Sequence, residues 1–220
     1  MSEKPALDVM RSAAGCNHCF DTVPGLRRVP LGLPKPRWIG SRYCTACPRV
    51  VIILLNPGDS SRLGEDWNRR ERQRFDVFFE SGDYDQLRAY FRTRREEELR
   101  GTTAAKPVFS WYESVFGLAF EEIAQINMAW CASVSNNYQK MLQPCFDRYT
   151  GRLLLALQPH AVLLSGSNVH KFERPIQQLL PDVRVRKTLH YANRKSRAEE
   201  SEEGTAVRSW LKDLRAALGC

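Results

Sequence analysis

Short apolar runs alternate with longer amphipathic stretches along this chain. The first run, 50–55, is rich in β-branched residues and too short for a stable helix, so it predicts a strand buried on both faces. Further strands are predicted over 123–130, 161–164 and 183–185. Helical spacing of apolar residues predicts two helices within 64–100, broken near Gly82-Asp83, and others over 109–116, over 145–157, up to 180 and from about 205 onward. This alternation predicts one doubly wound α/β domain, 1–220, around a mostly parallel four-stranded sheet.

Residues 1–49 show no such pattern. They carry Pro24, Pro30, Pro34, Pro36 and Pro48, which leave little room for a helix or a sheet ladder. We therefore expect an irregular segment packed on the domain. A metal bound through Cys16 and Cys19 would hold it in place.

Composition narrows the class of protein. A length of 220 residues with 43% hydrophobic and 26% charged residues is ordinary for one globular domain. No apolar run approaches the ~20 residues of a membrane span, and the N-terminus is too polar for a signal peptide. We expect a cytoplasmic monomer without a membrane partner. The net charge of +8 suggests a polyanionic partner, with a generally basic surface as the alternative.

Polar clusters directly follow three of the predicted strands. They are Asn56-Pro57-Gly58, the segment 127–137, and the segment 190–194. The carboxyl ends of parallel strands lie along one edge, so these clusters can converge on one pocket. Neither a phosphate-binding Gly-x-x-x-x-Gly-Lys-Ser/Thr loop nor a Gly-x-Gly-x-x-Gly motif is present. We therefore expect no nucleotide cofactor.

Seven cysteines in a chain expected to be cytoplasmic point away from disulfides and toward metal. Cys16/Cys19 and Cys44/Cys47 form two Cys-x-x-Cys pairs, whose spacing allows a zinc site. The C-terminal Cys220 has no predicted role.

The ordered motifs resemble the uracil-DNA glycosylase superfamily. The matching pieces are LLNPG (54–58), INMAWC (126–131), LQPHAVLLSG (157–166) and LHYANR (189–194). The order of Cys16, Cys19, Cys131 and Cys145 is similar to that of its iron–sulfur branch, family 4. The resemblance implies a three-layer α/β/α fold and a [4Fe–4S] cluster on those four thiolates. Zinc on Cys16, Cys19, Cys44 and Cys47 is the alternative.

The resemblance also implies roles in hydrolysis of the bond between base and sugar, with DNA as the partner. Asn56 would hold the attacking water, His190 would donate to the base oxygen, and Asn127 would read the pyrimidine edge. Further contacts are assigned to the flipped base and to DNA phosphates. The base contacts are Pro57, Gly58, Asp59, Phe75, Ser165 and Asn168, and the phosphate contacts are Arg194, Lys195 and Arg197.

Departures from the family pattern bear on the substrate. The first motif is Leu-Asn-Pro-Gly where the iron–sulfur branch has Gly-Glu-x-Pro-Gly, and the final element is His190-Tyr-Ala where that branch has His-Pro-Ser. Small residues after Gly58 leave room beside C5 of a pyrimidine. The candidate substrates are therefore uracil-type bases and bulky 5-modified cytosines, such as those of modified phage DNA.

The polar clusters contain no lysine to act as a Schiff-base nucleophile, so we expect a monofunctional glycosylase that leaves an abasic site. The rival hypothesis is a nucleic-acid-binding module with a structural metal and no turnover.

Overall fold

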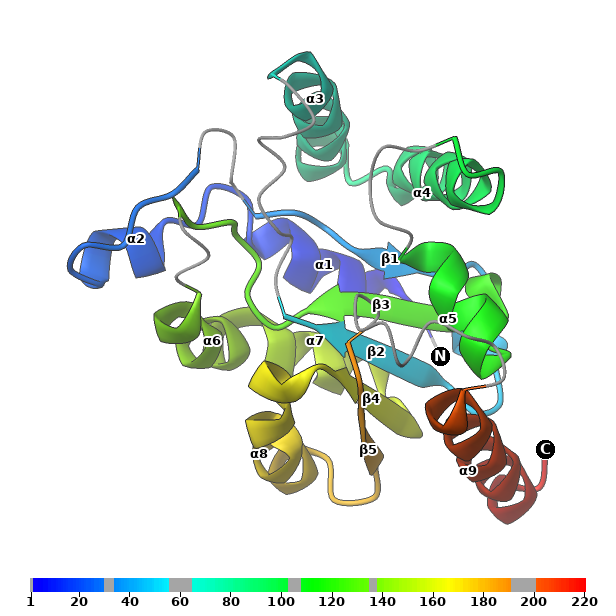
Figure 1. The fold of residues 1–220 in the computed structure, drawn as a ribbon. Coiled ribbons are helices and arrows are strands. Elements are labelled where there is room, and N and C mark those ends of the chain that lie inside the picture. The colour runs from blue at the N-terminus through cyan, green and yellow to red at the C-terminus, as the bar shows by residue number, and fades with distance from the viewer. Residues whose placement is uncertain (1, 30–33, 56–64, 103–107, 135–137, 191–200) are drawn as a thin grey trace.

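A computed structural model describes residues 2–29, 34–55, 65–102, 108–134, 138–190 and 201–220. These segments form an α/β domain around one mixed sheet with strand order β1-β3-β2-β4-β5 (Figure 1). The strands are β1 (Trp38–Ile39), β2 (Val50–Leu54), β3 (Ile123–Asn127), β4 (Ala161–Ser165) and β5 (Arg184–Thr188). Strands β3, β2, β4 and β5 are parallel, as the alternation of strands and helices predicts.

The sheet has five strands in the described residues, so the prediction of four was one short. The missed strand, β1, pairs antiparallel with β3 through only two residues, which is too short to give an apolar period. Trp38 fixes it in place. Its ring stacks on Phe120 with 4.0 Å between centroids, and its Nε1 donates to the Phe120 carbonyl at 2.7 Å. A tertiary contact therefore determines this strand.

The described helices are α1 (Lys4–Ser12), α2 (His18–Thr22), α3 (Glu65–Ser81), α4 (Tyr84–Leu99), α5 (Phe109–Phe116), α6 (Gln139–Cys145), α7 (Gly151–Leu157), α8 (Glu173–Leu179) and α9 (Glu202–Leu218). Six of them, α3, α4, α5, α7, α8 and α9, match the predicted segments, whereas α1, α2 and α6 were not predicted. Helix α5 ends at Gly117, whose φ of 64° suits glycine. Residues Phe146–Thr150 form a single π-helical turn that joins α6 to α7. No described helix is long and apolar enough to cross a membrane.

The prediction of an irregular N-terminal segment was wrong for its first part. Helix α1 buries Ala6, Val9 and Met10, and it packs against α7. Its proline, Pro5, lies in the first turn, where the missing N–H costs no helical hydrogen bond. The prolines that suggested an irregular segment all lie after α1, so they do not interrupt its helical hydrogen bonds.

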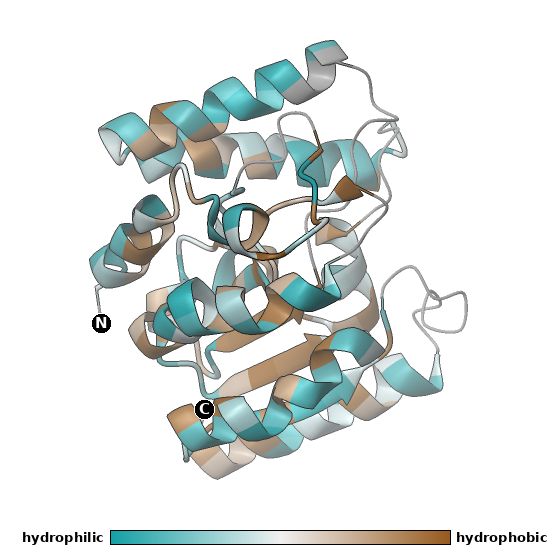
Figure 2. Cartoon of the chain, turned by 90° about the vertical axis from the view of Figure 1, so that its left-hand side faces the viewer, coloured by the Kyte–Doolittle hydropathy of each residue, from teal (hydrophilic) through white to brown (hydrophobic). Residues whose placement is uncertain are grey.

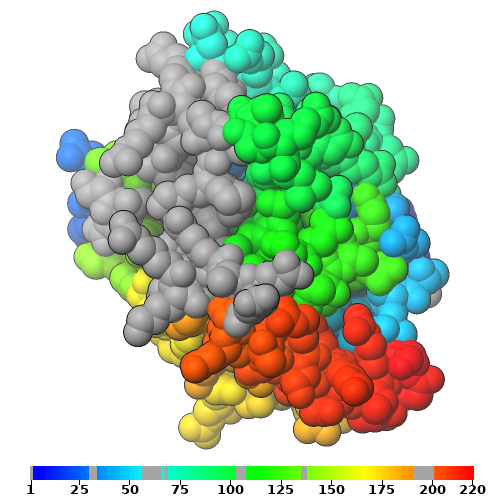
Figure 3. Space-filling model, turned by 45° about the vertical axis from the view of Figure 1, so that its right-hand side comes forward, coloured from blue at the N-terminus to red at the C-terminus, as the bar shows by residue number. Residues whose placement is uncertain are grey.

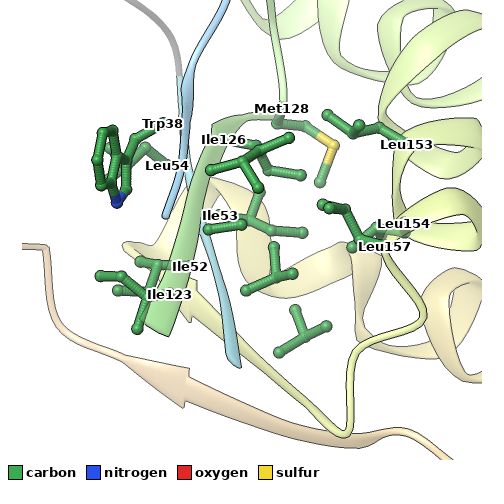
Figure 4. Packing of buried hydrophobic residues seen from close by; sticks show 14 of the residues in the cluster. Trp38, Ile52, Ile53, Leu54, Ile123, Ile126, Met128, Leu153, Leu154 and Leu157 are labelled. Carbon is green, nitrogen blue, oxygen red and sulfur yellow. The ribbon is translucent and has the colours of Figure 1, made fainter. Parts of the chain in front are cut away.

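Helices cover both faces of the sheet. On one face, Leu153, Leu154 and Leu157 of α7 pack on Ile53 and Ile126 (Figure 4). On the other face lie α5 and α9, which contact each other and appear as the green and red surfaces of Figure 3. The hydropathy colouring shows apolar strands between helices whose outer surfaces are polar (Figure 2). The arrangement is a layer of strands between two layers of helices.

Candidate functional site

The carboxyl ends of the four parallel strands carry one row of residues. In the strand register Leu54 pairs with Asn127, Ile53 pairs with Leu164, and Ser165 pairs with Thr188. Asn127, Leu54, Ser165 and Thr188 are therefore lateral neighbours on one face of the sheet, about 4.8 Å apart from strand to strand. We call them the edge row.

The edge row brings together the strands that precede the predicted motifs. Strand β2 leads into Asn56-Pro57-Gly58, and β5 leads into His190, with β4 alone between them. Two strand spacings amount to about 10 Å, which is the scale of a nucleobase held between groups on its two sides.

Hydrogen bonds continue past the ends of β2 and β3. The amides of Met128 and Ala129 donate to the carbonyls of Leu54 and Leu55 at 2.7 and 2.8 Å. The buried Thr150 supports the same turn, because its hydroxyl donates to the carbonyls of Asn127 and Met128 at 3.1 and 3.2 Å. Thr150 lies in the π-helical turn, a feature that often accompanies functional sites. The Asn127 side chain is itself only 2% exposed.

His190 lies two residues beyond the edge row and is half-buried beside Gly166. A Cβ atom built on Gly166 would lie 3.3 Å from both Cβ and Cδ2 of His190. Gly166 also has a φ of 102°, which other residues rarely adopt. Only glycine at this position lets the imidazole approach the end of β4 so closely.

The peptide before His190 is held from two sides. Ser165 Oγ donates to the Leu189 carbonyl at 3.2 Å, and the Leu189 amide donates to Glu203 Oε1 of α9 at 3.2 Å. Ser165 Oγ in turn accepts from the hydroxyl of Tyr112 at 3.0 Å. Ser165 is fully buried, and its hydroxyl already has a donor and an acceptor. We therefore correct its predicted role from a base contact to a support for the His190 segment.

Tyr112 and Glu203 were not predicted as site residues. Tyr112 reads as one more apolar position of the aromatic helix α5, and Glu203 as one of several acidic residues in the first turn of α9. Neither has a local motif that would single it out. Gly166, by contrast, follows an apolar strand in the motif LLSG, and that position could have been marked as a turn glycine at the sheet edge.

Four cysteines converge on one small cavity beside the carboxyl edge. Cys16, Cys19, Cys131 and Cys145 all line it, together with Pro34, Trp130 and Tyr149. These thiols come from four places along the chain: Cys16 precedes α2, Cys19 lies on α2, Cys131 follows β3, and Cys145 ends α6. In the described part of the chain, no three cysteine, histidine or carboxylate side chains are already spaced as around a bound metal ion.

The cysteines influence each other's ionisation. The pKa of Cys19 is lowered, mainly because its sulfur accepts a hydrogen bond from the Cys145 thiol. The same hydrogen bond and burial raise the pKa of Cys145. Burial, and then the nearby charges of Cys16 and Cys19, raise the pKa of Cys131 to about 12. Thiols that interact in this way form one cluster with the chemistry of a soft-metal ligand set.

The other cysteines lie elsewhere. Cys47 forms a disulfide with Cys220, with 6.0 Å between their Cα atoms. This corrects two expectations, the absence of disulfides and the lack of a role for Cys220. The two residues are 173 positions apart, and only the docking of α9 brings them together. Neither Cys44 nor Cys47 lines the cavity of Cys16 and Cys19, so this structure does not assemble the alternative zinc set.

Two predicted base contacts have other surroundings in the structure. Phe75 is 1% exposed and packs edge-on against Tyr90, with 6.2 Å between ring centroids, so it belongs to the core rather than to the edge row. Asn168 follows β4, and its Oδ1 accepts from Gln139 Nε2 at 2.6 Å.

Seven predicted site residues lie outside the described residues. They are Asn56, Pro57, Gly58, Asp59, Arg194, Lys195 and Arg197. A comparison of the chain with protein-family models and another with curated protein sequences found no match.

Proposed function

We propose that this protein is a monofunctional DNA glycosylase that hydrolyses the N-glycosidic bond of a damaged or modified pyrimidine and leaves an abasic site. The fold is proposed to be that of the uracil-DNA glycosylase superfamily. The observation that carries the proposal is the edge row: β3, which ends in Asn127, and β2 and β5, which lead to Asn56 and His190, all end at the same edge of the sheet.

The proposed roles follow from the chemistry of the bond. Cleavage develops positive charge on the sugar and negative charge on the departing base, so the enzyme must position water and stabilise the base anion. Asn56 would orient the water but cannot act as a general base, because an amide does not accept a proton at neutral pH. His190, held by the Leu189 contacts, would donate to the base oxygen. Asn127 would pair with the polar edge of the flipped base, since an amide has both a donor and an acceptor.

The cysteine cavity supports a [4Fe–4S] cluster as part of the proposal. Its four thiols are the standard ligand set for such a cluster. When bound, the cluster would tie the N-terminal segment to the end of β3 and to α6, and no step of the base-release reaction needs it. Metal and sulfide analysis with visible absorbance of anaerobically purified protein tests this part, and a colourless, zinc-loaded protein would contradict it.

The experiment for the function is a base-release assay. DNA duplexes and single strands carrying uracil, hypoxanthine, 5-hydroxymethylcytosine or its glucosylated form are incubated with the protein and then treated with alkali, which cuts at abasic sites. We expect scission on at least one substrate. Uracil and the glucosylated cytosine separate the two proposed substrate classes.

Three variants make the assay specific. Asn56→Ala and His190→Ala should abolish or strongly reduce scission, whereas His160→Ala, which changes a histidine at the opposite end of the sheet, should leave it intact. If no substrate is cut although the protein binds DNA, the glycosylase proposal is wrong and the rival binding module is favoured.

A further inference from the structure

Two consecutive helices, α3 and α4, leave an open groove of about 680 Å³ between them. The α3 side is formed by residues 70, 73, 74 and 77, which share one helix face by their spacing. The α4 side is formed by residues 86, 89, 90, 93, 94 and 97, which again share one face. One stripe of each helix thus lines the groove.

The stripes have the wrong composition for helix packing. Neighbouring helices normally fill the space between them with apolar side chains. Here the α3 stripe carries the exposed Arg70, Gln73 and Arg74, and its one apolar member, Val77, is 40% exposed. The two helices pack on each other next to this stripe, where Phe75 contacts Tyr90 and Phe78 contacts Tyr84. The α3 stripe is therefore a polar surface that takes no part in the apolar packing of the pair.

Arginines dominate the charge of the groove. Arg70, Arg74 and Arg94 line it, and Glu97 is the one acidic residue in its lining, paired with Arg94 at 2.7 Å. Arg74 lies over the ring of Tyr90 at 4.7 Å from the centroid, so it bridges the two helices. Tyr90 is fixed in turn, because its hydroxyl donates to the buried Glu71 at 2.9 Å. An arginine placed over an aromatic ring still has in-plane N–H groups that can bind a phosphate.

We infer that this groove binds the phosphodiester backbone of a nucleic acid, without reading its sequence, as a second contact surface beside the edge row. Among the described residues, the lining offers charge and hydrogen-bond donors, and its one aromatic residue, Tyr90, is only 9% exposed, which suits a nucleic acid better than an acidic protein. Helix α3 begins at Glu65, nine residues after Asn56. At most about 30 Å of extended chain separates the two, so one DNA can span both surfaces. The inference that one DNA contacts both surfaces rests on the proposed function. The inference that the groove binds a nucleic acid rests on the residues that line the groove.

The test uses two double variants of the full-length protein with the same loss of charge. Arg70→Gln/Arg74→Gln removes two guanidinium groups from the groove. Arg69→Gln/Arg100→Gln removes two from the same helices outside it, where the side chains are 62% and 67% exposed and pair with Asp66 and Glu96. Binding to a fluorescent duplex of normal bases is measured from low to high salt, and thermal unfolding checks that both variants fold.

We expect the groove variant to bind about tenfold more weakly and to reduce the slope of log K against log [salt] by nearly 2, about 0.9 per lost duplex phosphate contact. The control variant should change the slope by less than half as much. Equal slopes for the two variants would overturn the inference. The inference would also be overturned if polyglutamate displaced the fluorescent duplex as effectively as unlabelled DNA of equal charge does.

The test stands apart from that of the proposed function, because the duplex contains no base to excise. If the wild-type protein releases a base, the groove variant should raise KM and leave the rate at saturating DNA unchanged. Failure of base release with a normal groove effect would contradict the glycosylase alone, and the reverse result would contradict the groove alone.

Discussion

Histidines and cysteines lie at both ends of the central sheet, but their contacts differ between the two ends. At the amino end, His160 accepts the Arg49 amide on Nδ1 at 3.0 Å, and Cys47 is joined to Cys220. At the carboxyl end, His190 is held through its backbone neighbour Leu189, and four cysteines remain free thiols around one cavity.

The comparison shows that polar groups at the two ends of the sheet make different kinds of contact. The polar groups at the amino end bond to backbone and complete the fold. At the carboxyl end, the support comes from Ser165, Glu203 and Thr150, which bond to the backbone around His190 and Asn127. Fixing the backbone beside a side chain limits where that side chain can move, which the proposed function requires of His190 and Asn127.

The largest expected effect tests the difference between the cavity cysteines and the disulfide cysteines. Cys131→Ser or Cys145→Ser should abolish metal binding and cost more than about 4 kcal/mol, because a bound metal contributes directly to folding. At about 2–4 °C per kcal/mol for a chain of this length, Tm should fall by about 10 °C or more. Metal analysis and thermal unfolding measure both effects.

Cys220→Ser is the control for this prediction. Removing the disulfide should cost about 2–5 kcal/mol and leave the metal content unchanged. Metal loss in Cys220→Ser, or full metal content in Cys145→Ser, would show that the two sets do not differ as described.

The second prediction concerns the two histidines. His190→Ala should lower the rate of base release by about 10²–10⁴-fold, the usual contribution of a positioned proton donor. His160→Ala should leave the rate within a few-fold and instead lower stability by about 1–3 kcal/mol, because the Arg49 amide loses its acceptor. Single-turnover kinetics and urea unfolding on both variants measure the contrast. A comparable loss of rate in both would remove His190 from the site.

A smaller effect is expected from changing Ser165, whose hydroxyl supports the His190 segment. Ser165→Ala leaves the Leu189 carbonyl and the Tyr112 hydroxyl without their partner, and misplacement of the neighbouring imidazole should lower kcat by about tenfold, or about 1.4 kcal/mol. KM should change little, because the hydroxyl does not touch the base. Tyr112→Phe, which keeps Ser165 in place, should have a weaker effect. A rise in KM with unchanged kcat would restore Ser165 to its predicted role as a base contact.

The smallest effect is the pH dependence of His160. Burial, and then the charge of Arg49, lower its pKa in the folded protein. The unfolded state therefore binds the proton more readily, and the stability that depends on the neutral ring is lost as pH falls below about 6.5. Because the ring is partly solvated, we expect less than about 1 kcal/mol.

His160→Asn is the matched variant, since its amide oxygen can accept the Arg49 amide but does not titrate. Thermal unfolding between pH 5 and pH 8 should show a smaller loss of Tm toward acid in this variant than in the wild type. Identical profiles would mean that His160 does not contribute to the pH dependence.

The sequence by itself determined the parallel core of the sheet and most of the helices. The runs that became β2 and β4 are apolar at every position except Ser165 at the end of β4, and a strand that is buried on both faces has this pattern wherever it lies. The break of 64–100 at Gly82-Asp83 was equally local, because Asp83 caps α4 by accepting from the amides of Asp85 and Gln86. The convergence of Cys16, Cys19, Cys131 and Cys145 was expected from the family resemblance of their order along the chain, and the structure places them around one cavity.

Only the tertiary structure decided the two-residue strand β1, the disulfide between Cys47 and Cys220, and the support of His190 by Ser165 and Glu203. Each depends on a contact between segments far apart in the chain, and such a contact leaves no period or motif in the sequence around it. Helix α1 is different, because Ala6, Val9 and Met10 have helical spacing, and the prolines after it led to the prediction of an irregular segment. The groove between α3 and α4 likewise depends on tertiary structure. The local pattern predicted two helices, but which stripe of each one faces the other follows only from how the pair docks on the sheet.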